Sequence, residues 1–335
     1  MNELRKTMRE LIESLKSSES LIQKKAISDI WKYLPTTSEI NGEEVLLGDD
    51  TAAIKSDDHY LLIAGEGVYH PLLKSNPYLA GRTSVLTNVN DIYSMGGRPI
   101  ALIDVLSSSN NSETKEVLRG ICDNANRYKV PVVGGHISQD ADCSSLSVFI
   151  LGKAKSLLSS FNAREGDDLV FVCNSKGKFV SGFNFWDSSS MLKDDEALSD
   201  LELIAQIAEE GLADSAKDVS MAGLIGSTLM LLESSQKGAL LNIDSIPKPC
   251  EVPLKDWLLT FPSYGFIFSL RPENTNKVKE KFKKKALSCE NIGRVTSDMK
   301  VTFVNKESEK ELFWDLNTES LIGVGNSTHS QVQHG

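Results

Sequence analysis

Two short apolar runs decide the fold: LGDDTAAI at residues 47–54 and YLLIAGE at residues 60–66. Runs of this length, bounded by Gly and Asp, are typical of β-strands, and the polar turn between them predicts a hairpin. In that hairpin Asp50 and Glu66 lie diagonally on one face at the open end, within side-chain reach of each other. A register shifted by one residue would put Asp49 there instead. A solvated Gly-Asp-Asp turn is the alternative, because Asp favours turns.

On either side of this hairpin, the sequence patterns divide the chain into four parts. Residues 1–40 carry apolar residues about every 3.6 positions, which predicts a helical extension, interrupted near residues 17–20 and attached as an appendage. Residues 41–160 and 161–310 each alternate apolar strands with helices, which predicts an α/β (α+β) protein of two domains. Residues 311–335 are predicted to be a tail, frayed over the last ten residues.

Composition narrows the chemical class. The 335 residues are 40% hydrophobic and 24% charged, which suits two ordinary domains. Lys and Arg number 36 against 46 Asp and Glu, so the net charge of −10 argues against nucleic acid or a membrane as partner. No apolar run has membrane-spanning length and the first residues do not resemble a signal peptide, so we expect a cytoplasmic protein. The five scattered cysteines are expected to be reduced.

A polar stripe crosses an otherwise apolar helix predicted at residues 78–95. Ser84, Asn88 and Asp91 recur at spacings of four and three, so they lie on one face of that helix. Asn and Asp inside a helix each cost about 0.5 kcal/mol relative to Ala, so something must compensate. A divalent cation would, because Mg²⁺ binds a few carboxylates together with phosphate oxygens and water. A stripe that faces solvent is the alternative.

Two further candidate sites lie where elements are predicted to end. Gly134 and Gly135 follow an apolar strand, where they would let a ligand approach the backbone with His136 facing it. Ser220 precedes an apolar helix and is a natural N-cap, with free N–H groups behind it for a phosphate. An ordinary loop histidine and plain helix capping are the competing explanations. The sequence contains neither a Walker nor a Rossmann glycine loop, and no nucleophile elbow.

Taken together, these segments resemble the aminoimidazole ribonucleotide (AIR) synthase superfamily. The matching motifs occur in order: GDDTA at 48–52, NDIYSMGGRP at 90–99, GGHI at 134–137 and DVS at 218–220. The superfamily also contains thiamine-monophosphate kinase, selenophosphate synthetase and a hydrogenase maturation factor. The resemblance covers about residues 43–305, and four ordered motifs over that span are far more specific than any one of them.

The resemblance implies a fold, a cofactor and an activity. It implies a β-rich N-terminal domain that pairs into a homodimer, a C-terminal α/β domain, and ATP with Mg²⁺ held between acidic loops. It implies an ATP- and Mg²⁺-dependent enzyme that phosphorylates or otherwise activates a small-molecule substrate. Such sites work mainly by positioning and charge neutralisation.

The resemblance also implies roles for individual residues. Mg²⁺ ligands would be Asp49, Asp50, Glu66 and Asp91. Catalytic positions would be Asp91, His136 and Asp218. Nucleotide-binding positions would be Asp49, Asp50, Gly65, Glu66, Asn88, Gly134, Gly135 and Ser220. Asp104 resembles an Asp of AIR synthase that follows the same Asn-Asp motif.

Departures from the named members limit the assignment. Selenophosphate synthetase has a reactive N-terminal cysteine, whereas the first cysteine here is Cys122. Thiamine-monophosphate kinase has acids where this chain has His136 and Met221, which removes negative charge and predicts fewer metals or another phosphate acceptor. The chain most resembles the uncharacterised AIR-synthase-related branch, through KDVSMAG at 217–223 and PSYGF at 262–266. Thiamine-monophosphate kinase and a non-catalytic nucleotide-binding regulator or subunit remain alternatives.

Overall fold

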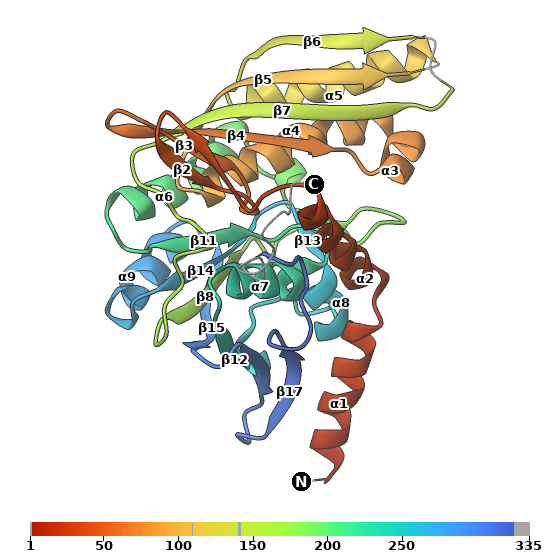
Figure 1. Ribbon diagram of the computed structural model, residues 1–335. Helices are drawn as coiled ribbons and strands as arrows, with labels where there is room; N and C mark the ends of the chain where they lie inside the picture. Colours follow the sequence, from red (N-terminus) through yellow and green to blue (C-terminus); the bar gives the residue numbers. More distant parts are fainter. Residues whose placement is uncertain (1, 109, 140–141, 325–335) are drawn as a thin grey trace, which may run out of the picture.

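The computed structural model describes residues 2–108, 110–139 and 142–324, and it shows two α/β domains with an N-terminal extension (Figure 1). The first sheet lies at the top of Figure 1, and the second sheet lies below it with the extension alongside. This arrangement confirms the two-domain α/β prediction. The frayed end predicted for the last ten residues lies outside the described residues.

The first domain is a five-stranded sheet with helices on one face. Its strand order is β3-β4-β7-β5-β6, and within it only β5 and β6 pair in parallel. Helices α4 and α5 pack against each other beneath the sheet (Figure 1). The elements are β3 Ala52–Ser56, β4 His59–Gly67, α3 His70–Ser75, α4 Pro77–Ser94, β5 Arg98–Ser107, α5 Asn111–Arg127, β6 Val132–Ser138 and β7 Ser145–Ala154, preceded by a small hairpin of β1 Thr37–Ile40 and β2 Glu43–Leu46.

The second domain is a seven-stranded sheet in the order β11-β14-β8-β15-β12-β16-β17. Its strands are β8 Asp168–Cys173, β11 Ser215–Asp218, β12 Gly238–Asn242, β14 Gly265–Leu270, β15 Ser288–Thr296, β16 Lys300–Val304 and β17 Lys310–Asp315. Its helices are α6 Asp194–Glu209, α7 Gly223–Ser234, α8 Leu254–Leu259 and α9 Pro272–Lys283. A small separate sheet contains β9 Lys178–Phe179, β10 Phe185–Asp187 and β13 Phe261–Pro262.

One hydrophobic core runs through both domains. It joins the helix-covered face of the first sheet with α6, α9 and one face of the second sheet. A second core lies on the opposite face of the second sheet, under α7 and α8. Because close-packed interiors resist deformation, the loops at the junction of the two domains are held in fixed positions.

The sequence predicts the N-terminal extension to be an appendage, but in the structure it forms part of the second core. It consists of α1 Asn2–Lys16, α2 Glu19–Lys25 and the 3₁₀-helix Ala26–Lys32, with a break at the predicted place. Met8, Ile12, Leu15 and Leu21 are buried in the second core. The apolar stripe predicted beyond residue 21 fails, since Ile22, Ile27, Ile30 and Leu34 are exposed. A 3₁₀-helix has three residues per turn, so the 3.6-residue period no longer selects one face.

The hairpin of β3 and β4 forms as predicted, but in the alternative register. Ala52 pairs with Ile63, whereas the first prediction would place it opposite Leu62. Pairing also begins only at Ala52, so the preceding Gly-Asp-Asp residues leave the sheet as a loop. The two neighbouring aspartates are therefore free to point in different directions.

Two predicted element boundaries are wrong, and both concern candidate ligand sites. Gly134, Gly135 and His136 do not follow a strand but lie within β6, paired with β5. A Cβ at Gly135 would lie 2.6 Å from Oδ1 of Asp104 on β5, so the glycine allows the two strands to approach closely. Ser220 does not cap α7, because the helix begins at Gly223.

The segment predicted as a tail begins inside the second domain. Residues 310–315 form β17, which pairs antiparallel with β16 at the edge of the seven-stranded sheet. None of the helices in the described ranges is long and apolar enough to cross a membrane. All five cysteines are free thiols.

Candidate functional site

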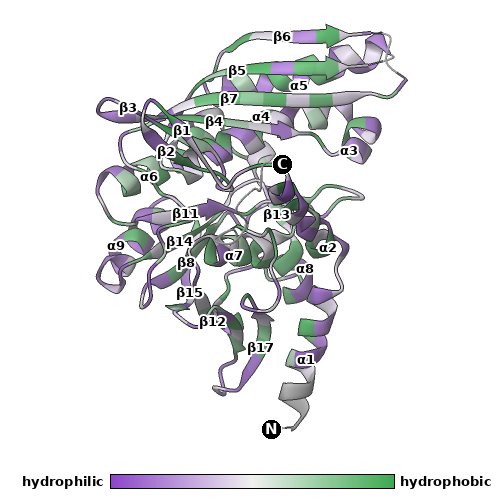
Figure 2. Ribbon diagram, in the orientation of Figure 1, coloured by the Kyte–Doolittle hydropathy of each residue, from purple (hydrophilic) through white to green (hydrophobic). Residues whose placement is uncertain are grey.

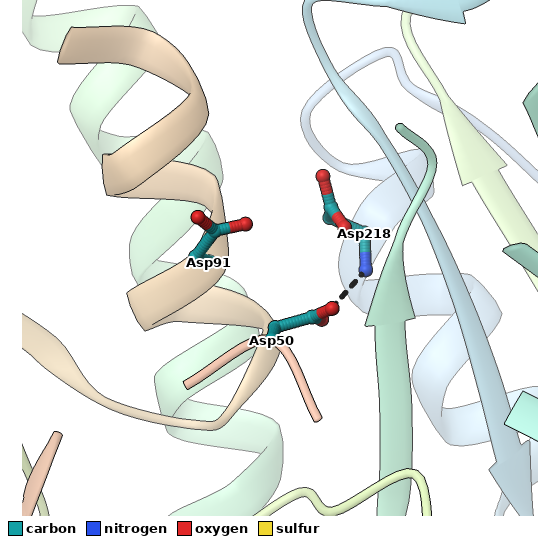
Figure 3. Close-up of side chains that lie close together, drawn as sticks. All are labelled: Asp50, Asp91 and Asp218. Carbon is teal, nitrogen blue, oxygen red and sulfur yellow. Dashed lines mark hydrogen bonds between the residues drawn. The ribbon is translucent and has the colours of Figure 1, made fainter. Parts of the chain in front are cut away.

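Three carboxylates from distant parts of the chain meet at the junction of the two domains. Asp50 comes from the loop before β3, Asp91 from α4 and Asp218 from the end of β11 (Figure 3). One oxygen from each lies within 4.8 Å of the others. We name this group the acidic cluster. Three carboxylates at this range could hold a divalent cation, which binds a small number of carboxylates together.

Asp91 has a carboxylate oxygen with no partner. Its side chain is 6% exposed, and within the described residues its Oδ2 accepts no hydrogen bond. The predicted polar stripe of α4 is thus buried rather than solvent-facing, and Asn88 also lies in it, donating from Nδ2 to the carbonyl of Ser84 at 2.8 Å. Burial, followed by the charges of Asp218, Glu66 and Asp50, raises the pKa of Asp91 well above its ordinary value.

Asp50 is held by a buried ion pair with Lys217. Their side chains are only 5% and 6% exposed. The other oxygen of Asp50 accepts hydrogen bonds from Oγ of Ser94 at 2.6 Å and from the backbone N–H of Asp218 at 3.3 Å. Burial lowers the pKa of Lys217, but the neighbouring carboxylates, Asp50 first, more than offset this and raise it overall. Lys217 is therefore a permanent cation beside the acidic cluster.

Asp218 is the third member of the acidic cluster. Burial and then the charge of Asp50 raise its pKa to about 8, against the opposing effect of Lys217 and Lys24. At neutral pH this carboxyl is mainly protonated while no cation is bound. A cation that binds there must displace the proton.

Asp49 does not point into the acidic cluster, although it is adjacent to Asp50. Its Oδ2 accepts from Oγ of Ser159 at 2.7 Å and the backbone N–H of Ser160 at 3.0 Å. Its Oδ1 accepts from Oγ of Ser160 at 2.6 Å and the backbone N–H of Asp50 at 3.0 Å. Both oxygens are thus occupied, and Asp49 fixes the loop to the connection between the domains.

Glu66 lies beside the acidic cluster rather than in it. It pairs with Val148 on β7 and faces the helix side of the sheet, like Ala64 two residues earlier. Partial removal from water raises the pKa of Glu66, and the charge of Lys24 opposes this. Gly65 faces the other side of the sheet, where a Cβ would meet the ring of Phe149 at 2.4 Å.

The structure does not bring His136, Gly134 or Gly135 to the acidic cluster of the same chain. Strands β7 and β5 lie between β4 and β6, which separates β6 from β4 by about 14 Å at the usual spacing of strands. His136 is exposed and pairs with Val105 on the open face of the sheet. Asp104 pairs with Gly135 on the covered face, where burial raises the pKa of its carboxyl. The catalytic role of His136 and the nucleotide-binding roles of Gly134 and Gly135 therefore stay predictions.

Ser220 lies two residues beyond Asp218, at the edge of the acidic cluster. Its backbone N–H donates to Oγ of Ser227 at 3.1 Å. Ala222 precedes α7 in a left-handed conformation with φ of 77°. The helix N-terminus that the sequence placed just after Ser220 therefore lies at Gly223, and phosphate binding there stays a prediction.

Sequence analysis missed residues that surround the acids. Lys217 was noted only as part of a motif, and nothing in its own strand, Ser-Ala-Lys-Asp, indicates the buried ion pair with Asp50. Ser94 follows Asp91 by one turn on the same helix face, and the same periodicity could have found it. No local signal points to Lys24, Ser159 or Ser160.

Comparison with known proteins agrees with this fold. Residues 48–154 match the N-terminal domain model of AIR synthase related proteins, and residues 165–306 match the C-terminal domain model. An uncharacterised protein of Synechocystis sp. is 42% identical over 84% of this chain and 88% of its own length. The chain therefore belongs to the AIR synthase related protein family.

Two solved structures have the same fold at 20% sequence identity. Thermotoga maritima PurL in complex with ADP superimposes with a TM-score of 0.74 over 91% of this chain, which spans only 52% of the PurL chain. The thiamine monophosphate kinase of Aquifex aeolicus in complex with AMPPCP and TMP superimposes with a TM-score of 0.61, over 80% of this chain and 92% of its own.

Proposed function

We propose that this protein is an ATP-dependent enzyme that uses Mg²⁺ at the acidic cluster to phosphorylate, and so activate, a small-molecule metabolite. One observation carries the proposal: Asp50, Asp91 and Asp218 converge within 4.8 Å, and the buried Oδ2 of Asp91 has no partner within the described residues. A buried polar atom without a partner is costly and requires an explanation. The residues present fit Mg²⁺, which prefers carboxylate oxygens and completes its shell with phosphate and water.

In such a site, some side chains would bind the metal and others would hold those ligands in place. Asp91 and Asp218 supply oxygens to the metal, while Lys217 and Ser94 hold Asp50 in a fixed orientation. Bound Mg²⁺ would neutralise the negative charge that develops on the phosphate oxygens during transfer. Preorganised groups of this kind act by positioning, since they do not reorganise at the moment of reaction. Glu66 and Ser220, which lie next to the acidic cluster, are the candidates for contacts with the nucleotide and the acceptor.

The relatives support a nucleotide as the phosphate donor. One solved neighbour is described as a complex with ADP and another as a complex with AMPPCP and TMP. Thiamine-monophosphate kinase is the finer alternative, and a relative of that name in Buchnera aphidicola is 27% identical over 80% of this chain. His136 and Met221 stand where the resemblance to that kinase would require acids, so we favour a different acceptor.

A nucleotide-binding regulator or subunit is the second candidate. The ion pair between Lys217 and Asp50 favours it, because it already neutralises one of the three carboxylates. Binding of ATP with Mg²⁺ but no turnover of any tested metabolite would support this candidate over the enzyme.

We also propose a homodimer formed through the open face of the first sheet. Apolar side chains lie on this face on three neighbouring strands, with Ile63 the most exposed at 46%. They are Ile63, Ile103, Val105 and Phe149. Figure 2 shows apolar stretches along β5 and β7, two of these strands. A large apolar patch of this kind marks an interaction surface, and a second copy would bring its own His136 to the interface.

Turnover of ATP tests the proposed activity. ADP release is measured with Mg²⁺ and a panel of candidate metabolites for the wild type, Asp91→Asn and the control Asp195→Asn, whose side chain is 89% exposed on α6. We expect one metabolite to stimulate ADP release, Asp91→Asn to reduce it by at least 100-fold, and the control to leave it unchanged. Wild-type turnover in Asp91→Asn would disprove the role of Asp91.

A further inference from the structure

A buried carboxylate at the end of α7 binds a short segment from the last part of the described chain. Glu233 is only 3% exposed. Its Oε1 accepts from Oγ of Ser320 at 2.5 Å and from the backbone N–H groups of Leu321 at 3.1 Å and Gly323 at 3.2 Å. Its Oε2 accepts from the backbone N–H of Ile322 at 2.8 Å. We name residues 320–324 the C-terminal segment.

The position of Glu233 would be unfavourable without these bonds. It is the second-last residue of α7, where the negative end of the helix dipole repels a carboxylate. It is also buried, and a charge removed from water must be compensated. Charge-assisted hydrogen bonds from a hydroxyl and three backbone N–H groups supply that compensation. Glu233 and the C-terminal segment therefore hold each other in place.

The C-terminal segment also packs against the loop that carries Asp49 and Asp50. Val324 is 3% exposed, and its Cγ2 lies 2.5 Å from where a Cβ on Gly48 would be. Gly48 has φ of 106°, so this position needs the backbone freedom of glycine and leaves no room for a side chain. Because Gly48 directly precedes the two aspartates, the C-terminal segment limits where their loop can lie.

Trp31 of the N-terminal extension contacts both the C-terminal segment and the loop. Its indole N–H donates to the carbonyl of Ile322 at 2.5 Å. Its ring lies 3.4 Å from where a Cβ on Gly48 would be and 2.9 Å from where a Cβ on Gly323 would be. The segment, the ring and the loop are thus packed together without space for a further methyl group.

The end of α7 supports the same loop by a second route. Oγ of Ser235, the residue that follows the helix, donates to the carbonyl of Ser160 at 2.6 Å. Ser160 in turn donates to Asp49 from its backbone N–H at 3.0 Å and from its Oγ at 2.6 Å. The end of α7 thus acts on Asp49 through Ser160 and on Gly48 through the C-terminal segment.

We propose that Glu233 is a positioning residue of the acidic cluster: by holding the C-terminal segment against Gly48, it fixes the loop that places Asp50 beside Asp91 and Asp218. The inference rests on the proposed function, because it takes the acidic cluster as the Mg²⁺ site. Asp50 belongs to the cluster and also accepts from the backbone N–H of Asp218, so a shift of the loop disturbs two of the three acids. Mg²⁺ demands a nearly ideal arrangement of its ligands, so a small shift weakens binding.

Calorimetry with MgCl₂ alone tests this role in the full-length chain. Glu233→Gln replaces one acceptor oxygen with an NH₂ group that cannot accept from the backbone donors. Val324→Ala keeps the hydrogen bonds of Glu233 and removes only the methyl groups at Gly48. Asp168→Asn is the matched control, because this carboxylate is also buried but lies about 13 Å along the sheet from the level of Asp218.

We expect Glu233→Gln to bind Mg²⁺ about tenfold more weakly than the wild type and Val324→Ala about threefold more weakly, since groups that orient metal ligands typically contribute at least about tenfold to metal affinity. Asp168→Asn should lower the melting temperature and leave the affinity unchanged, as should any residue that only stabilises the fold.

The outcomes separate this inference from the proposed function. If the wild type binds no Mg²⁺, the metal site and this inference both fail. If the wild type binds Mg²⁺ and either Glu233→Gln or Val324→Ala binds it equally tightly, only this inference fails. If Glu233→Gln does not fold, the affinity of Val324→Ala decides by the same criterion.

Discussion

Replacing Asp91 with Asn should make the metal-free protein more stable at neutral pH. The side chain is 6% exposed and its Oδ2 has no partner within the described residues, so the isosteric amide removes the titratable group without opening a cavity. The pKa of Asp91 is raised by burial and by the neighbouring carboxylates. Between the ordinary pKa and the raised one, the folded state keeps a proton that the unfolded chain has lost. Stability therefore falls as the pH rises through this window.

The size of this effect has an upper limit. Keeping Asp91 protonated at pH 7 against its ordinary pKa of 3.8 costs at most about 4 kcal/mol, since one pKa unit is worth about 1.4 kcal/mol. Burying the amide of Asn in its place costs roughly 1–3 kcal/mol. We therefore expect Asp91→Asn to add about 1–3 kcal/mol to the free energy of unfolding at pH 7, and to lower it by about 0–2 kcal/mol at pH 4.5, where keeping the proton costs only about 1 kcal/mol.

Urea unfolding at both pH values, with and without MgCl₂, measures this effect. Mg²⁺ at 100 times its Kd should stabilise the wild type by about 2.7 kcal/mol and should not stabilise Asp91→Asn. Asp195→Asn serves as the control, because its side chain is 89% exposed. The reasoning is refuted if Asp91→Asn is less stable than the wild type at both pH values, or if Mg²⁺ stabilises the two proteins equally.

Three other predictions concern the ion pair, the proton and the dimer. Lys217→Met should lower the free energy of unfolding by about 3–5 kcal/mol, because Asp50 is left buried without its cation; Lys129→Met, at an exposed position, should change it little in the same urea titration. Binding of Mg²⁺ at pH 7 should release a proton from Asp218, whose pKa is about 8. The buffer takes up this proton, so the calorimetric binding enthalpy should differ between Tris and PIPES, which have different protonation enthalpies. Equal enthalpies in the two buffers would count against proton release. Ile103→Asp on the open sheet face should give a monomer in light scattering, where the wild type should give a dimer.

The parts of the structure that depend on local periodicity could be predicted from the sequence. Helix α4 and its polar stripe follow from a spacing of three and four residues, which holds wherever the helix packs. The hairpin of β3 and β4 follows from two apolar runs and a turn. Its register does not, because a shift of one residue needs only a small change in the turn, and so Asp49 and Asp50 could not be distinguished.

The parts that depend on tertiary contacts could not be predicted. Strand β11 has only four residues, Ser-Ala-Lys-Asp, and little β-propensity, so nothing local places Asp218 beside Asp50. The extension has the apolar periodicity of any amphipathic helix, which does not say what its apolar face packs against. Its contacts with α7 and with the loop that carries Asp50 are made only in the folded chain. The position of His136 inside β6 was missed for a similar reason, since a strand that contains two glycines is held by its neighbour rather than by its own residues.

Four aspartates lie close together in a buried region, and each must be compensated for the chain to fold. Asp49 is compensated by hydroxyl and backbone donors, and Asp50 by Lys217. Asp91 and Asp218 have raised pKa values instead, so protons neutralise them while no metal is bound. A metal can replace protons without breaking a structural contact, whereas it could reach Asp49 only by breaking hydrogen bonds to the connection between the domains. The proposed exchange of protons for metal therefore involves Asp91 and Asp218, the two acids that no donor side chain of the described chain satisfies.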